Sequence, residues 1–235
     1  NIRFRSGQPE KIGGWTKDGG LTSSPLQPPA GAFWGVARTL WNWLTLAGYN
    51  LLGIGTHMKY YIQNGTFGTL YDVTPLRTTT AAGDVTFAAT DGLSVIVVTD
   101  ATHGASTGDF VTFSGAVSLG GTVTAAILNA EHQITYLTAN TYSITVSVTA
   151  NASDVGNGGA SVVGAYQLSL GGEIYAPGAG WGAGGWGGVT SGFSDTGWGS
   201  ASSAGTGLAL QLRLWSQSNY GQDLIFNPRG GGLYY

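Results

Sequence analysis

The chain of 235 residues has no cysteine and little charge. Without cysteine it has no disulfides and no cysteine-ligated metal sites. Lys, Arg, Asp and Glu together make up 9% of the residues, against about 25% in a typical soluble domain. A surface this poor in charge is typical of a subunit that is largely covered in a larger assembly.

Long hydrophobic runs and helical periodicity are also missing. No run of about 18 apolar residues is present, so we expect no membrane span. The opening residues "NIRFRSGQPEK" have no apolar stretch of the kind that a secretion signal carries. The chain is rich in glycine and threonine, and no long stretch repeats its apolar residues with the 3.6-residue period of an α-helix. The sequence therefore predicts an all-β fold.

Glycine and tryptophan are abundant instead, and they occur side by side. The stretch "GAGWGAGGWGG" at 178–188 contains Trp181 and Trp186, and Trp198 follows. Burying one such ring removes about 150–250 Å² from water, which offsets part of the entropy cost of ordering a glycine-rich loop. We interpret the three tryptophans as interface anchors on this chain or a neighbouring copy; the alternative is a flexible linker.

Strand and turn signals divide the chain into five segments. Residues 1–35 are expected to form an extended N-terminal arm. Residues 36–77 predict a four-stranded antiparallel meander of the size of one β-propeller blade. Residues 78–166, with turn signals every 8–12 residues, predict an inserted Ig-like β-sandwich. Residues 167–207 form the Gly/Trp-rich docking loop, and residues 208–235 start a second blade.

Charge is distributed unevenly over these segments. Residues 1–77 carry seven Lys and Arg against three acidic residues, whereas residues 78–166 carry six acidic residues and no Lys or Arg. One interpretation is chance in a charge-poor chain, since charge has little influence on fold. The other is that the segments face different neighbours.

No pattern of residues indicates a metal site. His57, His103 and His132 lie far apart, without metal-ligand spacing. Asp100, His103 and Asp109 lie together in "DATHGASTGD", where a cation site is conceivable. The favoured interpretation is a β-turn, because Asp, Gly and Thr are common in turns for their local hydrogen bonds.

Catalytic motifs are missing as well. The stretch "GASTG" at 104–108 resembles a nucleophile elbow, but that motif needs a helix after its turn and we expect strands on both sides. No pair of carboxylates of the kind that glycoside hydrolysis needs can be recognised around the three glutamates, Glu10, Glu131 and Glu173. No phosphate-binding glycine motif opens a helix. We therefore expect no catalytic residue, no cofactor and no enzymatic activity.

Six stretches in order carry a resemblance to a known family. They are "RFRSGQPEKIGGW" (3–15), "GTHMKYYIQNGTFGTLYDVTPLR" (55–77), "VTDATHGASTGDFVTFSGA" (98–116), "LTANTYSIT" (137–145), "YAPGAGWGAGGWGG" (175–188) and "LRLWSQSNYGQDLIFNPRGGGLYY" (212–235). Together they resemble the N-terminal part of the tail nozzle proteins, or DNA-stabilising tail accessory proteins, of short-tailed bacteriophages. The most specific piece is 55–77.

The resemblance implies a non-enzymatic virion protein. Such proteins have a propeller-like body with an inserted β-sandwich and form a hexameric ring that extends the DNA channel of the tail. Their implied partners are further copies, the portal and adaptor, tail fibre proteins and, transiently, the genomic double-stranded DNA that they retain until ejection. The implied location is the virion tail, assembled in the host bacterial cytoplasm. Family members are much longer, so the chain is expected to hold only the first blade, the insertion and the start of the next blade.

Two other functions remain open from the residues alone. One is a receptor- or carbohydrate-binding module that uses the insertion or the tryptophan loop. The other is a tail-associated glycan hydrolase. The lack of a recognisable pair of catalytic carboxylates argues against it.

Overall fold

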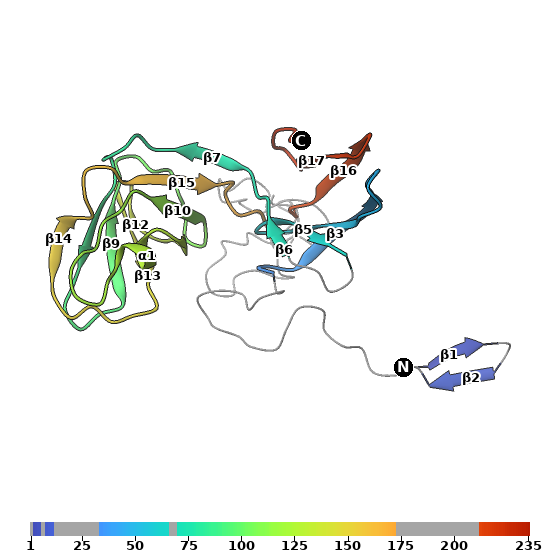
Figure 1. The fold of residues 1–235 in the computed structure, drawn as a ribbon, viewed down its shortest axis with the longest axis horizontal. Coiled ribbons are helices and arrows are strands. Elements are labelled where there is room, and N and C mark those ends of the chain that lie inside the picture. Colours follow the sequence, from blue (N-terminus) through green and yellow to red (C-terminus); the bar gives the residue numbers. More distant parts are fainter. Residues whose placement is uncertain (1, 6–7, 12–32, 66–69, 173–211) are drawn as a thin grey trace, which may run out of the picture.

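The computed structural model describes residues 2–5, 8–11, 33–65, 70–172 and 212–235. In this part the chain is all-β, with antiparallel sheets and one four-residue helix, α1 (Ala125–Leu128). Two bodies are visible in Figure 1: a nine-stranded unit formed by the middle of the sequence, and a smaller one that brings together strands from near both ends. No helix in the described ranges is long and apolar enough to cross a membrane.

The smaller body is built on a four-stranded meander. Its strands are β3 (Ala37–Leu44), β4 (Asn50–Thr56), β5 (Tyr60–Asn64) and β6 (Leu70–Asp72), paired in that order. Gly48, with φ of 82°, lies in the β3–β4 connection, where only glycine adopts a positive φ without strain. Alternating side chains then give the sheet two faces, as in any β-strand.

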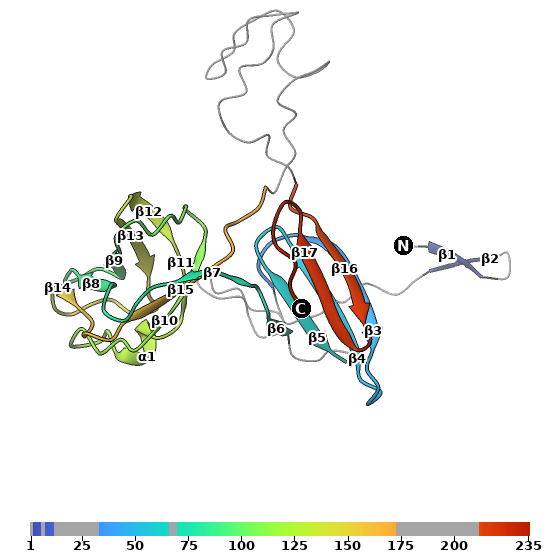
Figure 2. The same ribbon diagram turned by 90° about the horizontal axis from the view of Figure 1, so that it is seen from above.

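A hairpin of β16 (Trp215–Tyr220) and β17 (Asp223–Pro228) covers one face of this meander, as Figure 2 shows. The buried rings between the layers are Trp43, Tyr60, Trp215 and Phe226. Tyr60 stacks on Phe226 with ring centroids 4.4 Å apart and lies 5.0 Å from Trp215. The expected hairpin of a second blade therefore packs face to face on the first sheet and supplies half of its core.

Two glycines explain how the aromatic rings approach the sheet so closely. Gly53 and Gly55 lie on β4, on the face that the hairpin covers. A Cβ atom at Gly53 would overlap the Tyr60 hydroxyl, and one at Gly55 would overlap Trp215. The sequence "LLGIGT" is thus a strand with one face cleared for aromatic side chains.

The larger body is a sandwich of two antiparallel sheets. One sheet has the order β11 (Glu131–Gln133), β10 (Phe110–Ser114), β15 (Val163–Gln167) and β7 (Leu76–Thr79). The other has the order β12 (Thr135–Thr138), β13 (Thr141–Thr145), β9 (Val95–Thr99), β8 (Thr86–Ala89) and β14 (Asp154–Asn157). Side chains from both sheets form one core around Phe87, Phe113, Ile96, Tyr142 and Tyr166.

The chain enters and leaves the sandwich on neighbouring strands. β7 follows the meander directly, and it pairs with β15 through Tyr166 and Thr78. An insertion needs adjacent entry and exit points so that the host body can continue. The larger body therefore has the connectivity of a domain inserted into the smaller one.

The N-terminal segment contains a local hairpin. Residues Ile2–Arg5 (β1) and Gln8–Lys11 (β2) pair as an antiparallel hairpin, with Arg5 opposite Gln8. Two residues separate the strands, which is the commonest hairpin connection. The arm thus begins with local sheet structure.

Candidate functional site

The two bodies meet at a buried lysine. Lys59 lies immediately before β5, and its side chain is 1% exposed. Its Nζ atom lies 2.6 Å from Asp72 Oδ2 of β6 and also contacts Glu131 Oε1 of β11 in the sandwich. The ammonium also sits 4.1 Å from the centre of the Phe110 ring. One cation therefore holds a carboxylate from each body.

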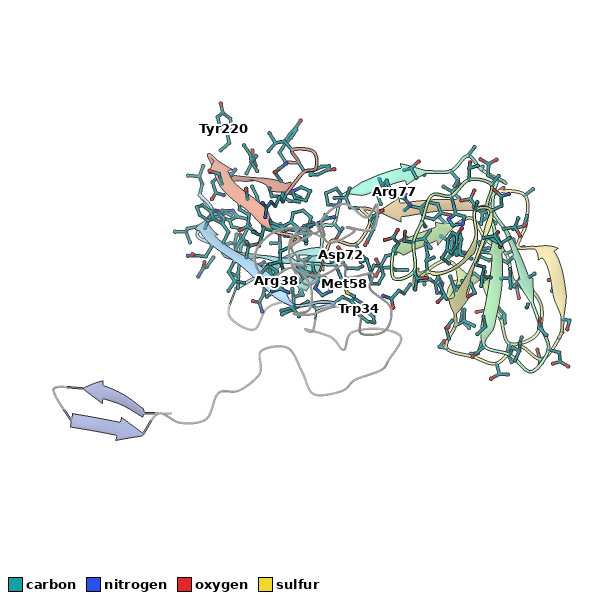
Figure 3. All side chains as sticks on the ribbon, turned by 180° about the vertical axis from the view of Figure 1, so that it is seen from behind. Trp34, Arg38, Met58, Asp72, Arg77 and Tyr220 are labelled. Atoms are coloured by element: carbon teal, nitrogen blue, oxygen red, sulfur yellow. The ribbon has the colours of Figure 1, made fainter. Side chains whose placement is uncertain are left out.

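Gln167 closes the same junction from the end of the sandwich. Its Nε2 atom donates to Glu131 Oε1 at 2.7 Å and to Asp72 Oδ2 at 3.2 Å. Figure 3 shows Asp72 in the region where the two bodies approach each other. Four side chains, two from each body, thus form one polar cluster, which we call the Lys59 junction: Lys59, Asp72, Glu131 and Gln167.

The two carboxyl groups of the junction differ in acidity. Burial raises the pKa of Glu131, and the Lys59 ammonium offsets this only in part. Burial acts in the same direction on Asp72, but there the ammonium and two hydrogen bonds from Thr74 outweigh it and lower the pKa. Only the ammonium is buried, whereas the Asp72 and Glu131 side chains are 27% and 33% exposed. The arrangement gives the buried cation two anionic partners and links the two bodies.

Aromatic groups seal this junction from the side. The backbone N–H of Trp34 donates to the Tyr61 hydroxyl at 3.0 Å, and the Trp34 ring lies 5.7 Å from that of Phe110. Burial raises the pKa of Tyr61, and the nearby Asp72 and Glu131 carboxylates add to the effect. Tyr61 is therefore neutral at physiological pH.

The suggested cation cluster is arranged as turns and core contacts. Asp100 accepts a hydrogen bond from the Tyr166 hydroxyl, and Tyr142 and Tyr166 share one at 2.8 Å. Asp109 accepts the backbone N–H groups of Ser106 and Leu170, both at 2.9 Å. These contacts correspond to the turn interpretation of the sequence. Among the described residues, no group of three metal-ligating side chains lies close enough to hold an ion.

The "GASTG" stretch at 104–108 connects two strands. β9 precedes it and β10 follows it, as the sequence predicts, so no helix follows the turn. His103 anchors this connection, because its Nδ1 atom accepts the Ala105 N–H at 3.0 Å and its Nε2 atom lies 2.9 Å from the Thr138 carbonyl oxygen.

His132 is buried in the sandwich and lies beside α1. Its Nε2 atom lies 3.1 Å from the Ile127 carbonyl and 3.2 Å from that of Leu128. Burial lowers its pKa, and these two hydrogen bonds oppose the effect only in part.

We expect the sandwich to lose stability as the pH falls below about 6.5, the pKa of an unfolded histidine. Below that value the unfolded chain takes up a proton that the folded chain resists, and the loss ends at the lower folded pKa. Urea unfolding at pH 7.5 and 5.5, followed by circular dichroism, measures it. In His132→Gln the pH dependence should become flatter; an unchanged slope would contradict the assignment.

The expected interface anchors Trp181, Trp186 and Trp198 lie outside the described residues, as does most of the docking loop. The described tryptophans have different environments. Trp43 and Trp215 are core residues between the two layers, and the Trp215 Nε1 atom donates to the Thr56 carbonyl at 2.7 Å. Trp41 is partly exposed on β3.

An apolar cavity of about 590 Å³ opens between the meander and the hairpin. Its aromatic lining consists of Trp43, Phe226, Tyr234 and Tyr235, and the polar side chains of Gln222 and Asp223 lie at the same cavity. Such a combination can hold a small ligand by ring contacts and a few hydrogen bonds.

Sequence analysis missed the Lys59 junction. Glu131 was considered only as a possible catalytic carboxylate, and its partners come from positions 59, 72 and 167. A signal was present nonetheless: Lys59 is the only charged residue between Arg38 and Asp72. A lone charge in an apolar strand region has to find a partner when it is buried.

Comparison with solved structures gives a distant likeness to a phage protein. No protein-family model and no curated protein matches the sequence. The solved structure of "Phage phi92 endosialidase" is similar with a TM-score of 0.31 and 13% identity. The match covers 51% of this chain and 16% of that chain.

Proposed function

We propose that the protein is a non-enzymatic structural component of a phage tail. The observation that carries this proposal is the apolar end of the smaller body, where Leu46 is 93%, Tyr220 78% and Leu44 66% exposed. Figure 3 shows Tyr220 projecting from the end of the hairpin. Exposed apolar groups in a charge-poor chain favour a protein that works inside an assembly.

The finer role that we propose is that of the tail nozzle. The six ordered stretches that resemble nozzle proteins support it, and so does the combination of a blade-sized meander with an inserted sandwich. In this role the chain would extend the DNA channel together with further copies and retain packaged DNA until ejection. The Lys59 junction would keep the inserted sandwich at a fixed position on the body.

Mass measurement tests the structural role. We expect the purified chain to form multimers, measured by light scattering after size exclusion, and a ring of six in electron micrographs for the nozzle role. Host polysaccharide should not be cleaved. A monomer at concentrations up to about 100 μM, well above the Kd of a typical specific complex, would contradict the proposal.

The aromatic cavity favours a second candidate, a carbohydrate-binding module. Sugar rings stack on aromatic faces, and Gln222 and Asp223 could accept hydroxyl hydrogen bonds. Binding on a glycan array that disappears in Tyr235→Ala would support this alternative. The absence of glycan binding would leave the structural role as the better account.

A further inference from the structure

We propose that the outer edges of β3 and β16 are the surface through which two copies of this chain associate. In this contact β3 of one copy pairs antiparallel with β3 of the other. The inference rests on the proposed structural role and names one contact surface between two copies; because a two-fold contact closes a pair, a ring of six would need a further, different contact.

The two edges lie together on one side of the smaller body. β3 is the first strand of the meander, and β16 pairs with β17 alone. Trp41 Nε1 donates to Asn219 Oδ1 at 2.5 Å, which places β16 over β3. Figures 1 and 2 show both strands on the side away from the sandwich. Within the described residues no strand pairs with either outer edge.

Apart from Arg38 and a register shift at the start of β3, these edges lack the features that normally protect a sheet edge. Natural edge strands carry charges, prolines or bulges that prevent pairing with another chain. Residues 39–58 and 214–222 contain no Asp, Glu, Lys, Arg or Pro. β16 pairs with β17 without a register shift, and the one irregularity of β3 lies at its start, between Ala37 and Thr39. Beyond the start of β3 both edges are regular, and no further strand of the described residues pairs with them.

Apolar side chains continue along the same edge. Leu40 and Leu44 are exposed on β3, Leu46 and Tyr49 follow in the turn, and Tyr220 stands at the end of β16. The turns are joined, because the Leu46 N–H donates to Gln222 Oε1 at 3.4 Å. Edge pairing would supply backbone hydrogen bonds and would also cover part of this apolar row.

The absence of charge identifies the partner as a second copy. Two-fold pairing brings each strand against its own sequence, so any charge near the axis would meet a like charge, which is destabilising. From Thr39 to Leu44, β3 carries no charge and avoids this penalty, whereas recognition of a charged partner would call for complementary charges. A pairing centred near Trp41 and Asn42 also keeps the two copies of Arg38 apart.

The opposite edge of the meander explains why the contact is two-fold. β6 is only three residues long, and its last residue, Asp72, is held by Lys59 beside the sandwich. A head-to-tail contact through the meander would need both of its edges, and of these two only the β3 edge is long and unpaired within the described residues. The remaining solution is an isologous contact, in which each copy offers the same edge.

Single cysteines test the pairing directly, because the native chain contains none. Three single-cysteine variants are each oxidised with copper phenanthroline and air: Leu40→Cys, Trp41→Cys and Asn42→Cys. The oxidation removes two hydrogens from two thiols and joins their sulfur atoms. A disulfide needs Cα atoms about 4.4–6.8 Å apart, so only the position nearest the two-fold axis should link in high yield. We expect one strong dimer band in this series, and none for Thr145→Cys on the exposed surface of the sandwich.

Lysine substitutions separate this inference from the proposed function. Leu40→Lys with Leu44→Lys should weaken association at least tenfold by light scattering, whereas Leu93→Lys with Leu137→Lys in the sandwich should not. Circular dichroism confirms that each variant is folded. Multimers that persist in the edge variant, with no disulfide in the series, would overturn the edge contact and leave the structural role standing. A wild-type monomer would overturn both.

Discussion

Replacing Lys59 with methionine is expected to lower the free energy of unfolding by about 3 kcal/mol, because removing the buried ammonium leaves two partly buried carboxylates without their cation. Methionine fills the space of the lysine stem, so the change removes chiefly the ammonium. Asp72 and Glu131 then face each other without a cation. Both keep some contact with water, which places the cost at the lower end of the range for buried pairs.

The distribution of tryptophan makes it possible to measure which of the two bodies loses stability in Lys59→Met. Residues 78–166 contain no tryptophan, so tryptophan fluorescence reports on the rest of the chain and circular dichroism on both bodies. In wild type the two signals should change together during urea unfolding. In Lys59→Met we expect them to separate, because the bodies no longer stabilise each other.

Neutralising the carboxylates provides the matched control. Glu131→Gln keeps the shape of the side chain, and burial already raises the pKa of this carboxyl, so its cost should stay below about 1 kcal/mol. The triple variant Lys59→Met, Asp72→Asn, Glu131→Gln should recover much of the stability lost in Lys59→Met. If Lys59→Met unfolds at the wild-type urea concentration, the junction does not stabilise the fold.

The second large effect is expected at Gly55. A Cβ atom there would overlap Trp215 Cδ1 and lie 2.5 Å from Thr39 Oγ1. Gly55→Ala should therefore push the hairpin away from the meander and cost about 3 kcal/mol, as overpacking of a tight core does. Thermal unfolding followed by tryptophan fluorescence measures the shift.

Gly164→Ala is the control for this prediction. Gly164 also lies inside a strand, β15, but a Cβ atom there would be 3.4 Å from Phe113 and Tyr166, an ordinary contact distance. We expect a change below about 1 kcal/mol for this variant. In addition, Gly55→Ala combined with Trp215→Ala should cost less than the sum of the two, because the second change removes the clash. Additive costs would show that Trp215 is not what Gly55 accommodates.

Some of the architecture was accessible from local sequence. Three local features predict an all-β chain: alternating polar and apolar residues in stretches such as 142–148, frequent turn residues, and the lack of helical periodicity. The structure confirms this class. The short helix α1, at Ala125–Leu128, lay beyond that reasoning, because four residues are too few to show a helical period. The resemblance to nozzle proteins concerns function, and it stays a proposal.

The site was less accessible, for reasons that are physical. The Lys59 junction combines residues up to 108 positions apart, and nothing local in "AEHQIT" indicates that Glu131 will meet a lysine from the other body. The role of Gly55 is equally non-local, since its neighbour Trp215 follows 160 positions later. Periodicity reports which face of a strand is apolar, but not which other strand covers that face.

The sequence alone therefore determined the strand-rich class, the scarcity of charge and the absence of cysteine chemistry, because these follow from composition and local backbone preference. The tertiary structure decided which residues share a core and which charges are buried together. It also decided which strands lie at the edges of the described sheets. Those outcomes depend on long-range packing, where one ammonium contacts two carboxylates and Gly55 makes room for a tryptophan ring from a distant part of the chain.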